Sequence, residues 1–399
     1  MVSSIAEVHN GHVHRVKDAE KALVLSLVST VPELTRKRLI EMLDIRPTTI
    51  SNVVQELLED GLVEEGAPQN RGSQGRPEFQ LLPKFTRLVA VAVRVVSRTL
   101  VASLVDFGDN TVAEESRLMP ESVGDAEARK IILEIIRTVC AEAPEDSELV
   151  GVGLSLPGIV NARQGRWVNS GRWPHVRELE ASDLERELDV PVQMHGMQAA
   201  ELRFLLERRP ELRNGGTLLF HWGYGIGAAY AFEGQVMSST LGSFAEIGHV
   251  RMFRDSRAPC MCGDFGCLET EAALWALLPR IREQFPAAPE EETAFTHFYD
   301  EIDSLSLPGI VRALDSVGLA LENLYRILFP DRVLIFGPFT SQQVLTDRLA
   351  ERFRRELPHY APGDVSFERL QNAFQGGETC GSTLSLFSES LRRLLTVRR

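Results

Sequence analysis

Four residues with metal-binding side chains lie close together in the second half of the chain. Cys260, Cys262 and Cys267 fall within one short segment, and His249 precedes them. Three thiolates and one imidazole satisfy a closed tetrahedral Zn²⁺ site with no position left for water, so the pattern predicts a structural zinc ion. The alternative is that these are reduced core cysteines beside a surface histidine.

Polar side chains that could read DNA gather on one face of a predicted helix near the N-terminus. The helix is expected to begin at Pro47, because the missing amide hydrogen of proline costs nothing at a first helical position. Apolar residues at helical spacing define its buried face: Ile50, Val53, Val54, Leu57 and Leu58. The opposite face carries side chains that can reach bases and phosphates in a major groove: Thr48, Thr49, Ser51, Asn52 and Gln55.

The segments around this helix predict a winged helix-turn-helix. A first helix is expected from Glu20 to Ser29, and a second follows Thr35, a suitable N-cap. Two strands, 62–65 and 78–81, are joined by a glycine-rich tip and predict the wing. Cations on the recognition side are expected to contact phosphates or the minor groove: Arg36, Lys37, Arg38, Arg46, Arg71 and Arg76. The unit resembles the winged-helix domains of bacterial repressors; the alternative is a three-helix interaction module whose polar face is merely solvated.

Composition limits where such contacts can occur. The chain has 399 residues, 44% of them hydrophobic, and a formal net charge of -13. This negative charge argues against binding of nucleic acid over the whole surface, because such binding needs clustered Lys and Arg side chains. Any DNA contact must therefore be local. The longest apolar run, 88–107, is interrupted by Arg94 and Arg98, and the N-terminus lacks a signal-peptide core. We therefore expect a cytoplasmic protein without a membrane partner.

Beyond Phe85 the pattern changes from helical to mixed. It predicts strand, strand, helix and strand, followed by a longer alternation of strands and helices, as in an α/β domain. Residues 1–18 lack a periodic apolar face and are predicted to form a flexible arm, and residues 19–84 to form the DNA-binding domain.

The run Glu246-Ile247-Gly248-His249, followed by Cys260-x-Cys262-Gly-x-x-Gly-Cys267-x-Glu269, resembles the mark of the ROK family of repressors, open reading frames and sugar kinases. The resemblance covers nearly the whole chain. It implies an actin-like (ribonuclease H-like) two-lobed ATPase fold with a sugar in the cleft between the lobes. The small lobe is expected at 85–195 and 381–399, and the large lobe, with the zinc knuckle and a dimer interface, at 196–380.

The same resemblance implies four sugar ligands. Asn169, Glu246, His249 and Glu269 match the family's sugar-binding positions. His249 would use one ring nitrogen for the metal and the other for the ligand. The alternative is that Glu246 and Glu269 only support neighbouring residues or face solvent.

Two features argue against a kinase. Residues 93–99 stand where the family has an Asp and paired glycines that receive ATP phosphates, and Gly196 occupies the position of the catalytic Asp. The resemblance therefore implies no enzymatic activity. His195 either replaces the Asp as a ligand contact or is a strand-end histidine satisfied by backbone. Tyr224 either fills the space of a nucleotide or is a packed aromatic.

These features together predict a repressor of carbohydrate-related genes. It would bind a palindromic double-stranded operator as a homodimer, with a tetramer as an alternative, and sense a sugar or sugar derivative. Two alternatives stay open: a sugar kinase with unusual active-site residues, and a DNA-binding dimer that responds to no ligand.

Overall fold

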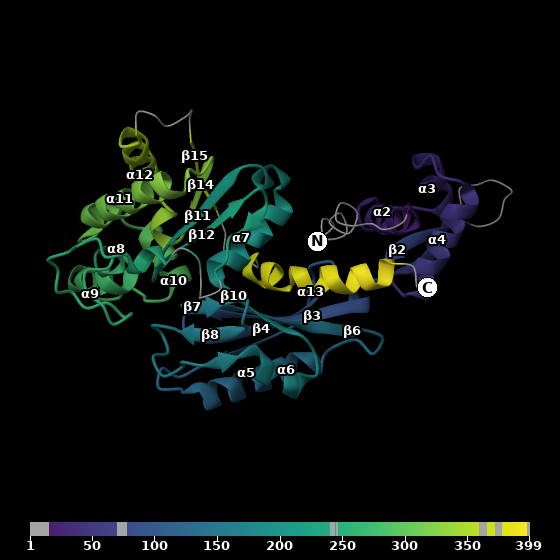
Figure 1. Cartoon of the computed structure of the whole chain (residues 1–399), viewed down its shortest axis with the longest axis horizontal. Coiled ribbons are helices and arrows are strands. Elements are labelled where there is room, and N and C mark those ends of the chain that lie inside the picture. The colour runs from purple at the N-terminus through teal and green to yellow at the C-terminus, as the bar shows by residue number, and fades with distance from the viewer. Residues whose placement is uncertain are drawn as a thin grey trace.

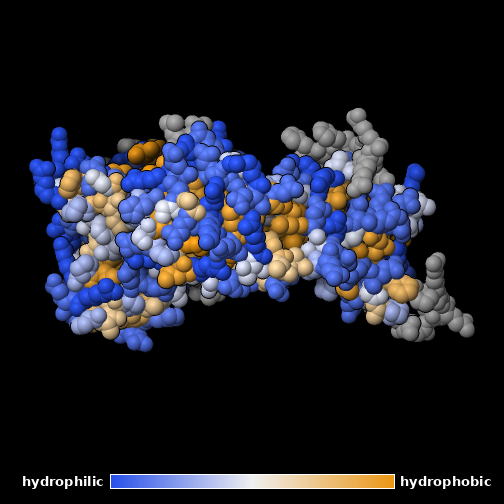
Figure 2. Space-filling view, turned by 90° about the horizontal axis from the view of Figure 1, so that it is seen from below, coloured by the Kyte–Doolittle hydropathy of each residue, from blue (hydrophilic) through white to orange (hydrophobic). Residues whose placement is uncertain are grey.

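Three parts make up the molecule in the computed structural model, which describes residues 16–69, 78–239, 244, 246–358, 365–371 and 377–396. A small N-terminal module lies at one end, and two larger lobes form the rest (Figure 1). Seen from below, the surface is largely hydrophilic, and the N-terminal module joins the lobes at a narrower part of the molecule (Figure 2). Among the described residues, no helix combines the length and the apolar character needed to cross a membrane.

The N-terminal module, called the winged module below, contains three helices and two strands: α2 (Val16–Thr30), α3 (Arg36–Met42), α4 (Pro47–Glu59), β1 (Val63–Gln69) and β2 (Glu78–Pro83). Thr35 caps α3 by accepting a hydrogen bond from the amide of Arg38 at 3.3 Å, and Pro47 begins α4. The strands pair antiparallel. This arrangement confirms the predicted winged helix-turn-helix.

The first helix begins earlier than predicted. α2 starts at Val16, so residues 16–18 are helical and do not belong to a loose arm. The helix is also held by a contact that no local pattern reveals: Lys21 is buried, and its Nζ donates to the carbonyl of Leu394 at 3.0 Å. This contact joins segments more than 370 residues apart and holds α2 against the segment around Leu394.

The first lobe is built on a five-stranded sheet with the strand order β10-β6-β3-β4-β5. Its strands are β3 (Leu88–Val96), β4 (Thr99–Asp106), β5 (Thr111–Leu118), β6 (Glu148–Leu156) and β10 (Val192–Gly196). β3, β4 and β5 pair antiparallel, whereas β6 and β10 run parallel to β3. α5 (Asp125–Cys140) and α6 (Ala181–Leu188) lie on one face, and α13 (Gly377–Leu395) lies on the other (Figure 1). A small sheet of β7 (Ile159–Asn161), β8 (Arg166–Asn169) and β9 (Leu179–Glu180) adjoins it.

The sequence predicts only two strands before the first helix of this lobe, and β5 corrects that prediction. β5 is the edge strand of the sheet, and only partly buried or exposed side chains alternate along it. Without a buried face, it lacks the apolar alternation by which a strand is recognised in a sequence.

The second lobe has a five-stranded sheet with the order β13-β12-β11-β14-β15. Its strands are β11 (Gly216–Trp222), β12 (Ile226–Phe232), β13 (Gln235–Val236), β14 (Arg332–Phe336) and β15 (Ser366–Arg369). One face packs on a large apolar core together with α8 (Glu269–Ala272), α9 (Leu274–Gln284), α10 (Glu292–Asp300), α11 (Ile310–Leu328) and α12 (Gln343–Arg355). The other face packs against α7 (Met197–Arg208).

Two helices, α7 and α13, carry the chain from one lobe to the other. α7 leads from β10 into the second lobe, and α13 returns from the second lobe to the first. They pack at backbone distance, because a side chain at Gly381 would overlap the carbonyl oxygen of Ala200. The cleft between the lobes lies at the start of α7, where Met197, Gln198 and Ala199 line it.

Candidate functional site

The cleft between the lobes gathers the residues that the sequence predicts as sugar ligands. Asn169 ends β8, His249 ends a short 3-10 helix, and Glu269 begins α8. Together with Glu246 they line one cavity. The structure therefore brings these four residues together, and their contact with a ligand stays a prediction.

Glu269 also organises the wall of this cleft. Its side chain is 5% exposed, and its Oε1 accepts a hydrogen bond from the amide of Ile226 at 2.7 Å. Its Oε2 accepts from the indole Nε1 of Trp275 at 3.0 Å. Each carboxylate oxygen has a further lone pair, so Glu269 can hold the loop between β11 and β12 and still accept from a ligand.

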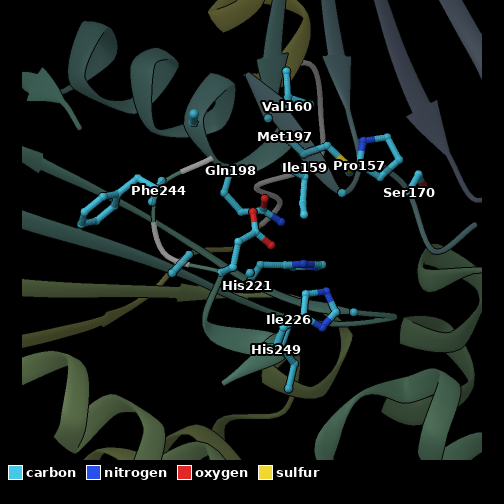
Figure 3. Close-up of a pocket in the computed structure, with 18 of the residues that line it drawn as sticks. Pro157, Ile159, Val160, Ser170, Met197, Gln198, His221, Ile226, Phe244 and His249 are labelled. Carbon is cyan, nitrogen blue, oxygen red and sulfur yellow. The ribbon is translucent and has the colours of Figure 1, made fainter. Parts of the chain in front are cut away.

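The floor of the cleft is the start of α7, where Gly196 is the N-cap. Figure 3 shows Gln198 and His221 around the same space. Behind them, Arg203 Nη1 donates to Nδ1 of His195 at 2.9 Å, and the backbone of Ser382 also bonds to this histidine. Burial, with help from Arg203, lowers the pKa of His195 to about 3, so its ring is neutral at physiological pH. His195 is thus held by protein groups, as the second of its two predicted roles requires, but it also lines the cavity, so its contact with a ligand stays a prediction.

An arginine that sequence reasoning missed crosses the mouth of the cleft. The guanidinium of Arg172 lies 4.4 Å from the ring centre of Tyr224 in the second lobe. Its Nη1 donates to the carbonyl of Ser97, in the turn between β3 and β4. Arg172 follows Asn169 by three residues, and this proximity is the only signal by which the sequence could have pointed to it.

A second unpredicted pair supports the loop between β11 and β12. Glu292 begins α10, and its Oε2 lies 3.1 Å from Nε2 of His221. Its Oε1 accepts from the amide of Tyr224 at 2.6 Å. Both members of the pair line the cavity. They lie 71 residues apart, and no sequence spacing connects them.

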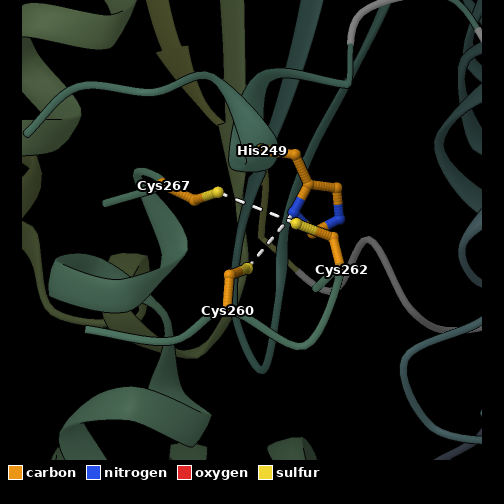
Figure 4. A group of neighbouring side chains, drawn as sticks. All are labelled: His249, Cys260, Cys262 and Cys267. Atoms are coloured by element: carbon orange, nitrogen blue, oxygen red, sulfur yellow. Dashed lines mark hydrogen bonds between the residues drawn. The ribbon is translucent and has the colours of Figure 1, made fainter. Parts of the chain in front are cut away.

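The predicted metal ligands form one cluster. One donor atom from each of His249, Cys260, Cys262 and Cys267 lies within 4.8 Å of all the others (Figure 4). The sulfurs of Cys262 and Cys267 are 3.7 Å apart, and Cys260 Sγ is 3.5 Å from His249 Nδ1. This group could hold a metal ion. Burial raises the pKa of Cys267 to about 11, so a metal ion that bound here would have to displace the thiol protons.

The metal cluster and the cleft share a wall. His249 and Cys262 belong to the cluster and also line the cavity. The loop between the cysteines wraps tightly, with Gly266 at a φ of 67° and no room for a side chain beside the carbonyl of Phe253. An ion in the cluster would therefore fix the position of this wall.

The predicted DNA-reading face lies on the winged module, far from the cleft (Figure 1). Arg46, Thr48, Ser51, Asn52 and Gln55 are exposed, and Thr49 is partly exposed. The helix has no side-chain cap at Arg46. Arg71 and Arg76 lie outside the described residues.

Two of the three cations of α3, Arg36 and Lys37, are paired with acidic residues of the wing. Arg36 forms an ion pair with Glu65 of β1, and Lys37 lies 3.6 Å from Glu78 of β2. Thr35 Oγ1 also donates to Glu78, at 3.2 Å. The start of α3 is thus tied to the wing by charge.

The comparison with protein families settles which family this architecture represents. The model of the ROK family matches residues 91–378. The chain belongs to the ROK family. Its fold agrees with a solved structure described as a ROK family transcriptional regulator and homologue of the Escherichia coli Mlc protein. The TM-score is 0.69 at 18% identity, over 95% of this chain and 98% of the other.

Relatives of two kinds are similar to this chain in sequence. The DNA-binding transcriptional repressor Mlc of Escherichia coli is 24% identical over 93% of this chain and 94% of its own length. A glucokinase of Halalkalibacterium halodurans is 29% identical, over 54% of this chain and 68% of its own length. The two-lobed, actin-like fold with an N-terminal winged helix-turn-helix is thus shown.

Proposed function

We propose that this ROK protein is a DNA-binding transcriptional regulator, and specifically a repressor, that senses a sugar or sugar derivative. The observation that carries the proposal is the exposed polar face of α4. This helix belongs to a winged module in the same chain as the two lobes, which together are called the ROK body. Ile50, Val53 and Leu57 are fully buried, while Ser51 and Asn52 between them are exposed. Such a helix presents hydrogen-bonding groups at the spacing that a major groove accepts.

The proposed partner is a palindromic double-stranded operator, bound by a homodimer. In that complex Thr48, Thr49, Ser51, Asn52 and Gln55 would approach base edges or phosphates. Arg36, Lys37 and Arg46 would approach phosphates, and Arg71 and Arg76 the minor groove. The relative Mlc, which is named a DNA-binding transcriptional repressor and is similar over 93% of this chain, supports the proposal that this chain binds DNA.

The proposed effector site is the interlobe cleft. Asn169, Glu246, His249 and Glu269 supply the amide, carboxylate and imidazole groups that accept or donate hydrogen bonds to sugar hydroxyls. Ligand binding between two lobes would shift the population of lobe arrangements.

We infer that the metal is zinc and that its role is structural. Two thiolate sulfurs about 2.3 Å from a tetrahedral ion would lie about 3.8 Å apart. Cys262 and Cys267 are 3.7 Å apart, which fits this geometry. His249 and the three cysteines fill all four positions, so no site is left for a reacting water.

The proposal excludes phosphoryl transfer. Gly196 has no side chain to take a proton from a sugar hydroxyl. Arg172 bridges the Ser97 turn and Tyr224, the two segments between which ATP phosphates would pass in a ROK kinase. The glucokinase relative keeps the kinase alternative testable: sugar-dependent ADP release from a panel of hexoses would establish it.

Selection of bound duplexes from a random-sequence library tests DNA binding directly. The selected operator is then titrated with Asn52→Ala, which should bind about 5- to 100-fold more weakly because a base contact is lost. Asn323→Ala removes an equally exposed amide on α11 and should bind like the unchanged protein. Failure to enrich any duplex, or equal affinity of both variants, would count against the proposal.

A further inference from the structure

α13 connects the region of the interlobe cleft with the winged module. At its first turn, buried Glu378 accepts a hydrogen bond from Ser155 Oγ at 2.8 Å. Ser155 lies on β6, opposite His195 of β10, which lines the cleft. A side chain at Gly377 would overlap the carboxyl of Glu201 on α7. The first turn of α13 is therefore packed directly under the cleft.

The body of α13 has little freedom to move independently. A side chain at Gly153 of β6 would overlap the carbonyl of Ser382, and one at Gly381 would overlap the carbonyl of Ala200. The helix therefore lies with its backbone against both β6 and α7. Because close-packed interfaces adopt discrete arrangements rather than deforming continuously, a shift at the cleft should move the helix as a rod.

The last turns of α13 pack in a core that they share with the winged module. Leu391, Leu394 and Leu395 are buried in the same core as Leu25 of α2 and Leu57 of α4. Figure 1 shows α13 running from the lobes to this module. Thus α4, the proposed recognition helix, and α13 share one apolar core.

Lys21 of α2 connects the ends of α4 and α13. Its side chain is 5% exposed, and its Nζ donates to Asp60 Oδ2 at 2.6 Å and to the carbonyl of Leu394 at 3.0 Å. Asp60 is the C-cap of α4. A buried ammonium therefore binds the C-terminal ends of α4 and α13 together, where both helix dipoles favour a cation.

The length of α13 amplifies a small motion. Its 19 residues span roughly 28 Å at 1.5 Å per residue. Rotation by about 10° around the cleft end would move the far end by roughly 5 Å. Paired recognition helices must enter grooves about 34 Å apart, so a displacement of that size would misalign them.

We propose that α13 transmits the state of the cleft to the recognition helix of the same chain, with Ser155 and Lys21 as the positioning residues at its two ends. That a ligand in the cleft changes operator binding through this link rests on the proposed function. The mechanical link between the cleft and α4 does not rest on it, and this link can be tested without a ligand and without DNA.

Hydrogen exchange of the full chain provides the test. Ser155→Ala removes the hydrogen bond at the cleft end. It should speed amide exchange in residues 16–30 and 47–59 by about threefold or more, a modest coupling for distant sites. Ser103→Ala is the matched control: Ser103 is equally buried and donates to Glu114 Oε2 at the same 2.8 Å, on a strand of the same sheet. It should leave both segments unchanged. Equal effects of the two variants, or none from Ser155→Ala, would overturn the proposal.

Coupling is reciprocal, so the opposite perturbation gives a second measurement if Ser155→Ala fails to fold. Lys21→Met keeps the length of the side chain but removes the ammonium. It should speed exchange at the cleft end, in residues 377–382 and 153–156. Lys84→Met, which removes an exposed pair with Asp146, should not. Unchanged exchange at the cleft end in Lys21→Met would contradict the link, whatever the outcome of the operator selection.

Discussion

His249 belongs to two sites at once. Its Nδ1 faces Cys260 in the metal cluster, while the residue also lines the interlobe cleft. A single residue can therefore make the shape of the cleft depend on the metal. At this scale the sequence was most informative, because the ligand spacing is local and all four predicted ligands lie together.

Replacement of one thiolate should release the metal. In Cys262→Ser we expect zinc affinity to fall by about 100-fold or more, since even supporting residues of a metal site contribute 10- to 100-fold. The melting temperature of the ROK body should fall with it. Zinc per chain, measured after dialysis, checks the first result. Cys140→Ser, which removes a half-buried cysteine outside the cluster, should retain the ion; retention of one zinc per chain by Cys262→Ser would refute the ligand set.

The acidic residues of the wing should restrain DNA binding. Glu65→Gln removes the partner of Arg36 and one negative charge from the proposed phosphate-facing side. We expect about 2- to 5-fold tighter binding of the selected duplex at low salt, the range of exposed charge pairs, and a smaller gain at high salt. Glu127→Gln changes the same charge at an exposed position of the first lobe and should have no effect. A weaker complex in Glu65→Gln would show that the ion pair positions Arg36 for DNA.

At the scale of elements, predictability followed burial. α4 has a regular buried stripe, and its start at Pro47 was predicted correctly. β5 has no buried face and was missed, and no local window contains the contact with Leu394 that holds α2. Arg172 and Glu292 were missed for the same reason: their roles come from the meeting of distant elements in the cleft.

The crossing of α7 and α13 contains two buried acidic residues, Glu201 and Glu378. Burial raises the pKa of Glu201 to about 8, with a further contribution from Glu378, and burial raises the pKa of Glu378 to about 7. The folded protein therefore holds these protons more tightly than the unfolded chain, in which such groups titrate near 4.5. Their contribution to stability is complete below pH 4.5 and is lost as the pH rises through about 7 to 8.

Glu201→Gln should reduce this pH dependence. The amide resembles the neutral carboxyl but does not titrate, so at pH 8.5 the variant should be more stable than the unchanged protein by about 1 kcal/mol or more. Urea unfolding at pH 5.5 and 8.5 measures the difference. Glu207→Gln, on the same helix, removes the partner of Arg213 and should instead destabilise at pH 8.5. A loss of stability in Glu201→Gln at pH 8.5 would show that Glu201 is ionised and paired.

At the scale of the whole molecule, the winged module and the ROK body are not independent units. One buried cluster joins α2 and α4 to β3, β6 and α13. The sequence predicted the two kinds of domain but not this shared core, because its members are separated by most of the chain.

Removal of the last turns of α13 should therefore damage the winged module. A chain that ends at residue 389 lacks Leu391, Leu394 and Leu395, and each buried leucine contributes roughly 1.5–3 kcal/mol. We expect a protease to cleave rapidly within residues 16–69. Mass spectrometry of the fragments identifies the sites of cleavage. A chain that lacks only residues 397–399 serves as the control. Equal resistance of both chains would show that the module folds without the last turns of α13.

The shared core also sets an order of events during synthesis. α13 emerges from the ribosome more than 300 residues after α4. Although domains usually fold as they are made, α4 has to wait for a late segment before its apolar support is complete. Interrupted translation would thus yield polypeptides that contain every proposed base-contacting residue yet lack the scaffold that aligns them, so incomplete chains would compete poorly for operators.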